Sequence, residues 1–123
     1  MAAKDRKSML LVIRHSPYGS SLAKAALDVA LAAAAFEQEV DLLFMGDGVL
    51  QLLPEQDSAE LGRKNIGRQW ASLPLYDINT VHVDAAAAAR YNIELDKLTV
   101  KSRALDAKGI HQLMAGFDHL LGF

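Results

Sequence analysis

The side chains that could do chemistry in this chain gather in three short segments, each at the end of an apolar run. These segments cover residues 14–21, 46–51 and 83–88. In an open α/β sheet, the functional crevice lies beyond the carboxyl ends of the strands. We therefore expect the three segments to line one crevice.

The first segment combines an imidazole with small polar residues before an expected helix. His15 places a titratable group there, and Ser16, Gly19, Ser20 and Ser21 could expose amides and hydroxyls that hold an anion or phosphate. The segment matches neither GxGxxG nor GxxxxGK[ST]. A simple turn and helix cap is therefore favoured, and the anion site remains an alternative.

The second and third segments contribute carboxylates. Asp47 could orient a ligand or a neighbouring subunit, although Asp-Gly is also a common turn pair. Gln51 belongs to the same segment. Asp84 follows a predicted strand, where a carboxylate is either a base or, as we favour, the cap of an alanine-rich helix.

The complete absence of cysteine limits the chemistry most strongly. It excludes disulfides, thiolate metal sites, persulfides and covalent cysteine catalysis. The four histidines, His15, His82, His111 and His119, do not have the spacing of a helical zinc motif, so we expect no metal and no other cofactor. Trp70 and Tyr76 could stack on a ring, but Trp70 falls in an apolar helical stripe and is expected in a core or interface.

The elements that position these segments are predicted by apolar patterning. Apolar runs predict strands at 9–13, 40–45, 80–83, 98–100 and 119–123. Helical spacing predicts a helix over 21–36, a short turn over 49–53, a helix containing Trp70, a compact helix after Asp84, and a last helix capped by Asp106. This alternation predicts an α/β fold with a single doubly wound, flavodoxin-like, five-stranded parallel sheet that has helices on both faces. The run 9–13 lacks polar alternation, so we expect it to be the central strand.

Length and charge limit the class of protein. With 123 residues, 51% hydrophobic and 23% charged, the chain is expected to form one domain over 1–123, with 1–6 a flexible N-terminus. A net charge of −2 provides no basic field, so direct nucleic-acid binding is not expected. The five-residue apolar run at 9–13 is too short for a signal peptide or a membrane span, and a cytoplasmic location is expected.

Three motifs together resemble a known family. They are Pro-Tyr-Gly-Ser at 17–20, Phe-Met-Gly-Asp-Gly-Val-Leu-Gln-Leu-Leu-Pro at 44–54, and Leu-Pro-Leu-Tyr-Asp-Ile at 73–78. In this order they resemble the TusC/DsrF branch of the DsrE/F family of sulfur-relay proteins, over residues 7–123. The segment 47–54 is the most specific part.

The resemblance implies a heterohexamer built with two homologous subunits, one of which carries a relay cysteine. That cysteine follows the third strand of the catalytic relatives, at the position of Asp84 here, and an aspartate cannot hold a persulfide. The chain would thus be a non-catalytic subunit that passes sulfur to a downstream acceptor protein only through its complex. The destination implied is the 2-thiouridine of a tRNA wobble base or, in sulfur-oxidising bacteria, dissimilatory sulfur metabolism. Tyr18, Asp47, Gln51 and Asp84 are the candidates for shaping the partner's pocket.

One other class remains as an alternative. A flavodoxin-like protein that binds flavin or another small ligand as a homo-oligomer would use the segment 14–21 as its phosphate loop. A phosphate-accepting receiver domain is rejected, because it needs an acidic pair where this chain has Arg14 and His15.

Overall fold

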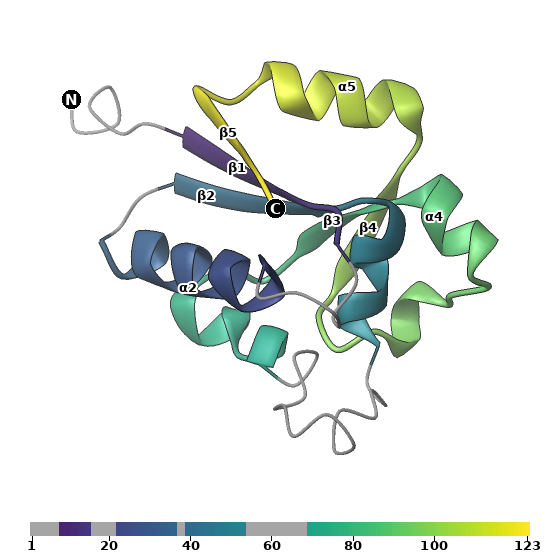
Figure 1. Cartoon of the computed structure of the whole chain (residues 1–123), viewed down its shortest axis with the longest axis horizontal. Helices are drawn as coiled ribbons and strands as arrows, with labels where there is room; N and C mark the ends of the chain where they lie inside the picture. Colours follow the sequence, from purple (N-terminus) through teal and green to yellow (C-terminus); the bar gives the residue numbers. More distant parts are fainter. Residues whose placement is uncertain (1–7, 16–21, 37–38, 54–68) are drawn as a thin grey trace.

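The computed structural model describes residues 8–15, 22–36, 39–53 and 69–123. Its elements, with η for a 3₁₀ helix, appear in Figure 1. In chain order they are β1 Ser8–Ile13, α2 Leu22–Ala35, β2 Glu39–Phe44, η1 Gly46–Leu52, η3 Leu73–Tyr76, β3 Val81–Asp84, α4 Ala85–Arg90, η4 Leu95–Lys97, β4 Ser102–Leu105, α5 Ala107–Ala115 and β5 His119–Gly122.

The five strands form one sheet in the order β4-β3-β2-β1-β5, and each neighbouring pair is parallel. The predicted five-stranded parallel α/β sheet is confirmed. Its order is not the flavodoxin-like 2-1-3-4-5, and the prediction that 9–13 forms the central strand is wrong. The centre is β2, because the chain adds β2, β3 and β4 successively on one side of β1 and returns with β5 to the other.

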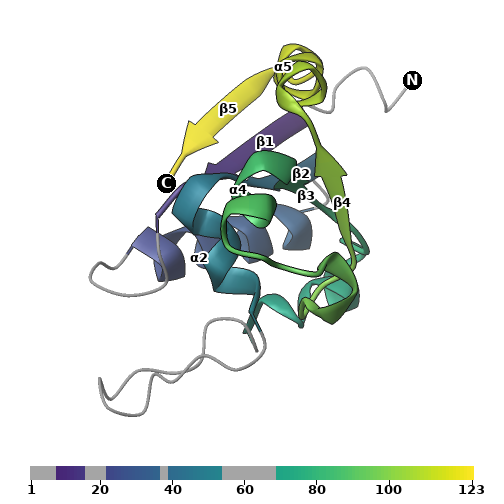
Figure 2. The same ribbon diagram turned by 90° about the vertical axis from the view of Figure 1, so that its right-hand side faces the viewer.

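Helices cover both faces of the sheet, as expected. Figure 1 shows α5 above the strands and α2 below them, and the view in Figure 2 separates the same two layers. Alternate residues of each strand point to opposite faces. In β1, Leu11 and Ile13 pack in the cluster between the sheet and α2, whereas Leu10 and Val12 pack in the cluster between the sheet and α5. The lack of polar alternation in β1 therefore reflects burial on both faces.

The helix starts follow the predicted caps. The carboxylate of Asp84 accepts a hydrogen bond from the Ala86 amide at 3.1 Å, and Asp106 accepts one from the Gly109 amide at 2.7 Å. Side-chain acceptors at these positions satisfy amides that have no partner within the helix. Both cap predictions are confirmed.

The fourth strand differs from its prediction. Residues 98–100 form bends, and β4 begins at Ser102. Val100 is buried as part of a loop that packs on the core, which explains why this apolar stretch resembled a strand. The true β4 is an edge strand with two exposed residues, Arg103 and Ala104.

Trp70 lies in the core, as predicted. It is fully buried, and its ring meets that of Phe44 edge-on at a centroid distance of 5.1 Å. Residues 69 and 70 are helical, and the 3₁₀ helix η3 follows at Leu73. The expected flexible N-terminus 1–6 lies outside the described residues. Within the described ranges, no helix is long and apolar enough to cross a membrane.

Candidate functional site

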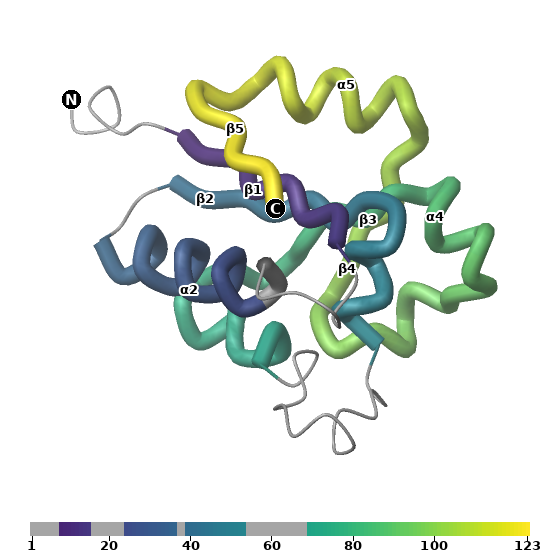
Figure 3. The backbone as a smooth tube through the Cα atoms, in the orientation of Figure 1, coloured from purple at the N-terminus to yellow at the C-terminus, as the bar shows by residue number. Residues whose placement is uncertain are grey.

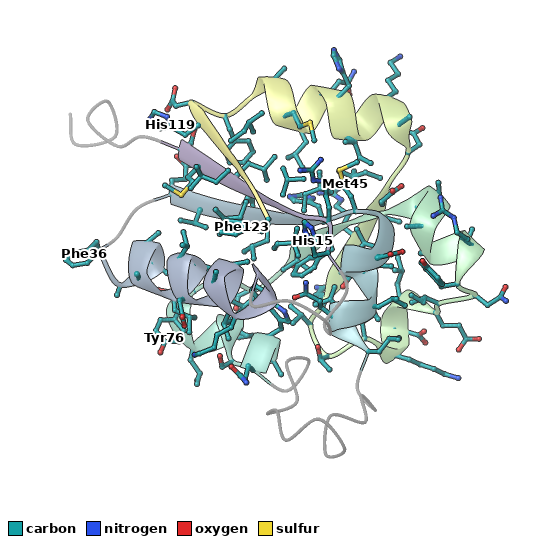
Figure 4. The ribbon with its side chains drawn as sticks, viewed as in Figure 1. His15, Phe36, Met45, Tyr76, His119 and Phe123 are labelled. Atoms are coloured by element: carbon teal, nitrogen blue, oxygen red, sulfur yellow. The ribbon has the colours of Figure 1, made fainter. Side chains whose placement is uncertain are left out.

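The candidate site is the edge of the sheet where β1, β2 and β3 end. His15, Asp47, Gln51 and Asp84 all belong to segments at this edge, and Figure 4 shows His15 just beyond β1. Ser16, Tyr18 and Gly19 lie outside the described residues. The described parts of the three segments thus lie at one edge of the sheet, and the structure shows how they are connected.

The direction of the chain changes at the ends of β3 and β4. The chain leaves β3 into α4, whose Ala87 and Ala88 pack in the same cluster as α2, but it leaves β4 into α5 on the opposite face. Ligands of open α/β sheets bind between neighbouring strands whose following helices lie on opposite faces of the sheet. Of the three predicted segments, 83–88 therefore lies beside the position where the helices after β3 and β4 leave on opposite faces.

Asp84 stands at this position and joins two segments. One carboxylate oxygen caps α4 through the Ala86 amide, and the other lies 3.5 Å from the amide nitrogen of Gly46, a long and weak hydrogen bond. Asp84 thus connects the end of β3 to the start of η1. Its carboxylate is occupied by backbone amides, which supports the cap interpretation over a free base.

Gln51 faces inward and not into the crevice. Its side chain is fully buried; Oε1 accepts a hydrogen bond from Nε1 of Trp70 at 2.9 Å, and Nε2 donates to the His15 carbonyl oxygen at 2.8 Å. The contact between Trp70 and Gln51 was not predicted. The available signal was a polar residue within the apolar run 49–53, which needs buried partners.

Gly48 brings η1 into direct contact with the end of β1. A Cβ built on Gly48 would lie 2.0 Å from the Ile13 carbonyl oxygen and 2.7 Å from its carbon. The same oxygen accepts a hydrogen bond from the Met45 amide at 2.9 Å. The backbone of the second segment is therefore packed against the backbone of the first.

Asp47 is bonded to the far side of the crevice. Its carboxylate accepts a hydrogen bond from the Tyr91 hydroxyl, which follows α4. This hydrogen bond, followed by desolvation and the negative charge of Asp47, raises the pKa of Tyr91, while Arg90 opposes the shift. Tyr91 was not predicted, because no local pattern marks an aromatic residue 44 positions away as a partner.

The Tyr91 hydroxyl gives a direct test of this contact. Because its pKa is raised, the Asp47–Tyr91 contact contributes stability that is present below about pH 10, the unfolded value, and is lost as the pH rises through the folded pKa. Ultraviolet absorbance titration is expected to show one tyrosine that ionises late, which Tyr91→Phe removes and Asp47→Ala returns to an ordinary pKa. A late transition that survives in Asp47→Ala would contradict the contact.

A surface groove of about 680 Å³ adjoins Tyr91. It runs between the end of η1 and the segment from α4 to η4. Half of its lining residues are aliphatic and the other half carry polar or charged groups; they are Leu50, Leu53, Ile93 and Leu98, and Tyr91, Asn92, Glu94 and Lys97.

Metal and ring-stacking chemistry find little support among the described residues. No group of three potential metal ligands lies together in the described ranges. His82 lies within β3, 3.5 Å from the Asp41 carboxylate, with its Nδ1 buried and lacking a hydrogen-bond partner. Tyr76 lies well away from His15 in Figure 4, and Trp70 is enclosed by the core. What the described edge offers is a set of connected loops and no nucleophilic thiol.

The comparisons with known proteins agree with one family. A model described as the DsrE/DsrF-like family matches residues 7–123. A Protein TusC homolog of Pseudomonas aeruginosa is 30% identical over 94% of this chain and 97% of that protein. The intracellular sulfur oxidation protein DsrF of Allochromatium vinosum is 36% identical over 75% of this chain and 68% of DsrF.

A solved structure supports the fold. The crystal structure of the ychN protein from E. coli matches with a TM-score of 0.81 and 22% identity, over 95% of this chain and 99% of that one. The resemblance found in the three sequence motifs is thus confirmed by matches that span nearly the whole chain. The chain belongs to the DsrE/DsrF-like family.

Proposed function

We propose that this chain is a non-catalytic subunit of a cytoplasmic sulfur-relay complex. Residues 1–123 would form a single domain that assembles with two homologous subunits, one of which carries the relay cysteine. The complex would pass sulfur to an acceptor protein and from there to the wobble 2-thiouridine of tRNA. The relatives named TusC and DsrF support a place in sulfur relay.

One observation carries the proposal. The family resemblance places the relay cysteine after the third strand, where this chain has Asp84 at the end of β3 and no cysteine anywhere. A relay step is the attack of a thiolate on a sulfane sulfur. Asp84 is instead bonded to the backbone of α4 and η1, so its chemistry is that of a structural cap.

The contacts at the carboxyl edge are consistent with a shaping role. Asp47, Gln51 and Asp84 each bind another part of the same chain. These bonds fix the relative positions of three loops that would face a partner. A rigid surface reduces the ordering cost of assembly, which favours the binding of a partner.

Purification from the native host tests the assembly. The tagged chain, expressed at its native level, is expected to copurify with two small homologues, one with a cysteine after its third strand. Light scattering of the purified sample is expected to give the mass of a hexamer with equal subunit amounts. A monomer or homo-oligomer, especially a yellow one that releases flavin, would contradict the proposal and favour the flavin-binding alternative.

A complementation assay tests the absence of catalysis. In a host that lacks this gene, Asp84→Asn is expected to restore tRNA 2-thiouridine to nearly the level given by the wild-type gene, because asparagine also caps helices. The matched control is Cys→Ser in the partner, which is expected to abolish the modification. Loss of 2-thiouridine in Asp84→Asn, with the complex still assembled, would show that Asp84 acts in the chemistry.

A further inference from the structure

Gln51 occupies a position that its burial alone does not explain. It lies in η1, yet its side chain bonds both to the His15 carbonyl after β1 and to the Trp70 indole in the core. We propose that Gln51 is a positioning residue, which fixes the backbone at His15, just after β1, relative to the Trp70 indole in the core. This inference concerns the isolated chain and does not depend on sulfur relay.

The amide group suits this task because it accepts and donates at once. Its oxygen takes the Trp70 Nε1 proton, and its nitrogen donates to the His15 carbonyl. Gln51 is fully buried, so the low dielectric strengthens its bond to Trp70 most, and leaving either end of the amide unpaired is costly. Neither an aliphatic side chain nor an ionised carboxylate of the same size can make both bonds.

The two ends of this chain of bonds differ in their surroundings. Trp70 is held by the core, where its ring packs against Phe44 of β2. His15 is exposed at the end of β1, where the chain leaves the sheet. Gln51 therefore ties an exposed backbone to a buried ring. This contact restricts where the His15 backbone lies at the edge of the sheet.

Neighbouring contacts show where a loss of positioning would be detected. The Arg14 amide donates to the Phe123 carbonyl at 2.7 Å, and the Met45 amide donates to the Ile13 carbonyl at 2.9 Å. Both bonds involve residues 13 and 14, directly before His15, so their local opening reports on the order of this backbone. Amide hydrogen exchange measures such opening separately from global unfolding.

The experiment compares three variants of the isolated protein, and a fourth, Gln51→Glu, tests for recovery at acidic pH. Gln51→Met removes both bonds and roughly keeps the volume; Trp70→Phe removes the indole donor together with part of the buried ring volume; and Leu52→Ala is the control for lost volume, because Leu52 is buried in the same 3₁₀ helix without a side-chain hydrogen bond. Exchange at each amide is expressed relative to the rate of global unfolding in the same variant.

With Gln51→Met and with Trp70→Phe, the Arg14 and Met45 amides are expected to exchange about tenfold faster than global unfolding explains. With Leu52→Ala, all amides are expected to change by the global factor alone. Gln51→Glu at acidic pH is expected to recover the protection, because a protonated carboxyl again accepts and donates. Equal, purely global changes in all three variants, or normal protection at Arg14 in Trp70→Phe, would overturn the proposal.

Discussion

Gly48→Ala is expected to lower the free energy of unfolding by about 3 kcal/mol or more, the upper end of what overpacking costs. The added Cβ would lie 2.0 Å from the Ile13 carbonyl oxygen, a separation that no real Cβ contact allows. Backbone atoms of β1 are the obstacle, and they cannot rotate away as a side chain would. Either η1 or the end of β1 must move, and the Met45–Ile13 hydrogen bond would be lost with it.

Gly46→Ala provides the matched control two residues away. Gly46 has a φ of +51° and nothing within 4 Å of an added Cβ, so the cost comes from the left-handed backbone alone, about 1–2 kcal/mol. Chemical denaturation monitored by circular dichroism is expected to rank wild type above Gly46→Ala and Gly46→Ala above Gly48→Ala. Equal losses in the two variants would show that η1 does not press on β1.

The second large effect is expected for Gln51→Glu and depends on pH. Above neutrality the introduced carboxylate would face the His15 carbonyl oxygen in a site with no solvent exposure, so burial raises its pKa in the folded state. Below about pH 4, the unfolded value, the carboxyl is protonated in both states and its hydroxyl can donate to His15. As the pH rises towards the folded pKa, only the unfolded state ionises.

The stability of this variant relative to wild type therefore falls with pH by about 1.4 kcal/mol per unit between the two pKa values. A shift of about two units or more, as is usual for buried carboxyls, gives a loss of about 3 kcal/mol at neutral pH. Urea denaturation of both proteins at a series of pH values measures the difference. A constant difference across the series would mean that water reaches Gln51.

The sequence predicted the parts of the fold that depend on neighbouring residues in the chain. The run 9–13 and the cap residues Asp84 and Asp106 have local signals, and the structure bears them out. The strand order had no such signal, because an apolar run shows that a strand is covered but not which strands lie beside it. β4 was misplaced for a related reason: an exposed edge strand has few buried residues to mark it.

The candidate site shows the same difference between local signals and contacts that depend on the folded chain. Patterning placed Asp47 and Asp84 at the ends of strands, where the structure has them. Their partners and those of Gln51 are residues such as Tyr91 and Trp70, which come from other elements and are found only when the chain is folded. Pairings of this kind leave no period in a sequence, so the connections within the crevice could not be predicted.

The position of β5 has a consequence for how the chain folds. β5 is the last strand in the chain and pairs with β1, and the bond from the Ser8 amide to Asp118 joins residues 110 positions apart. Figure 3 shows this return of the chain to its first strand. Contacts between distant residues slow folding, because the intervening loop must close first. During synthesis, β1 to β4 can emerge and associate while one edge of β1 stays unpaired, so the sheet is completed only once β5 has been made.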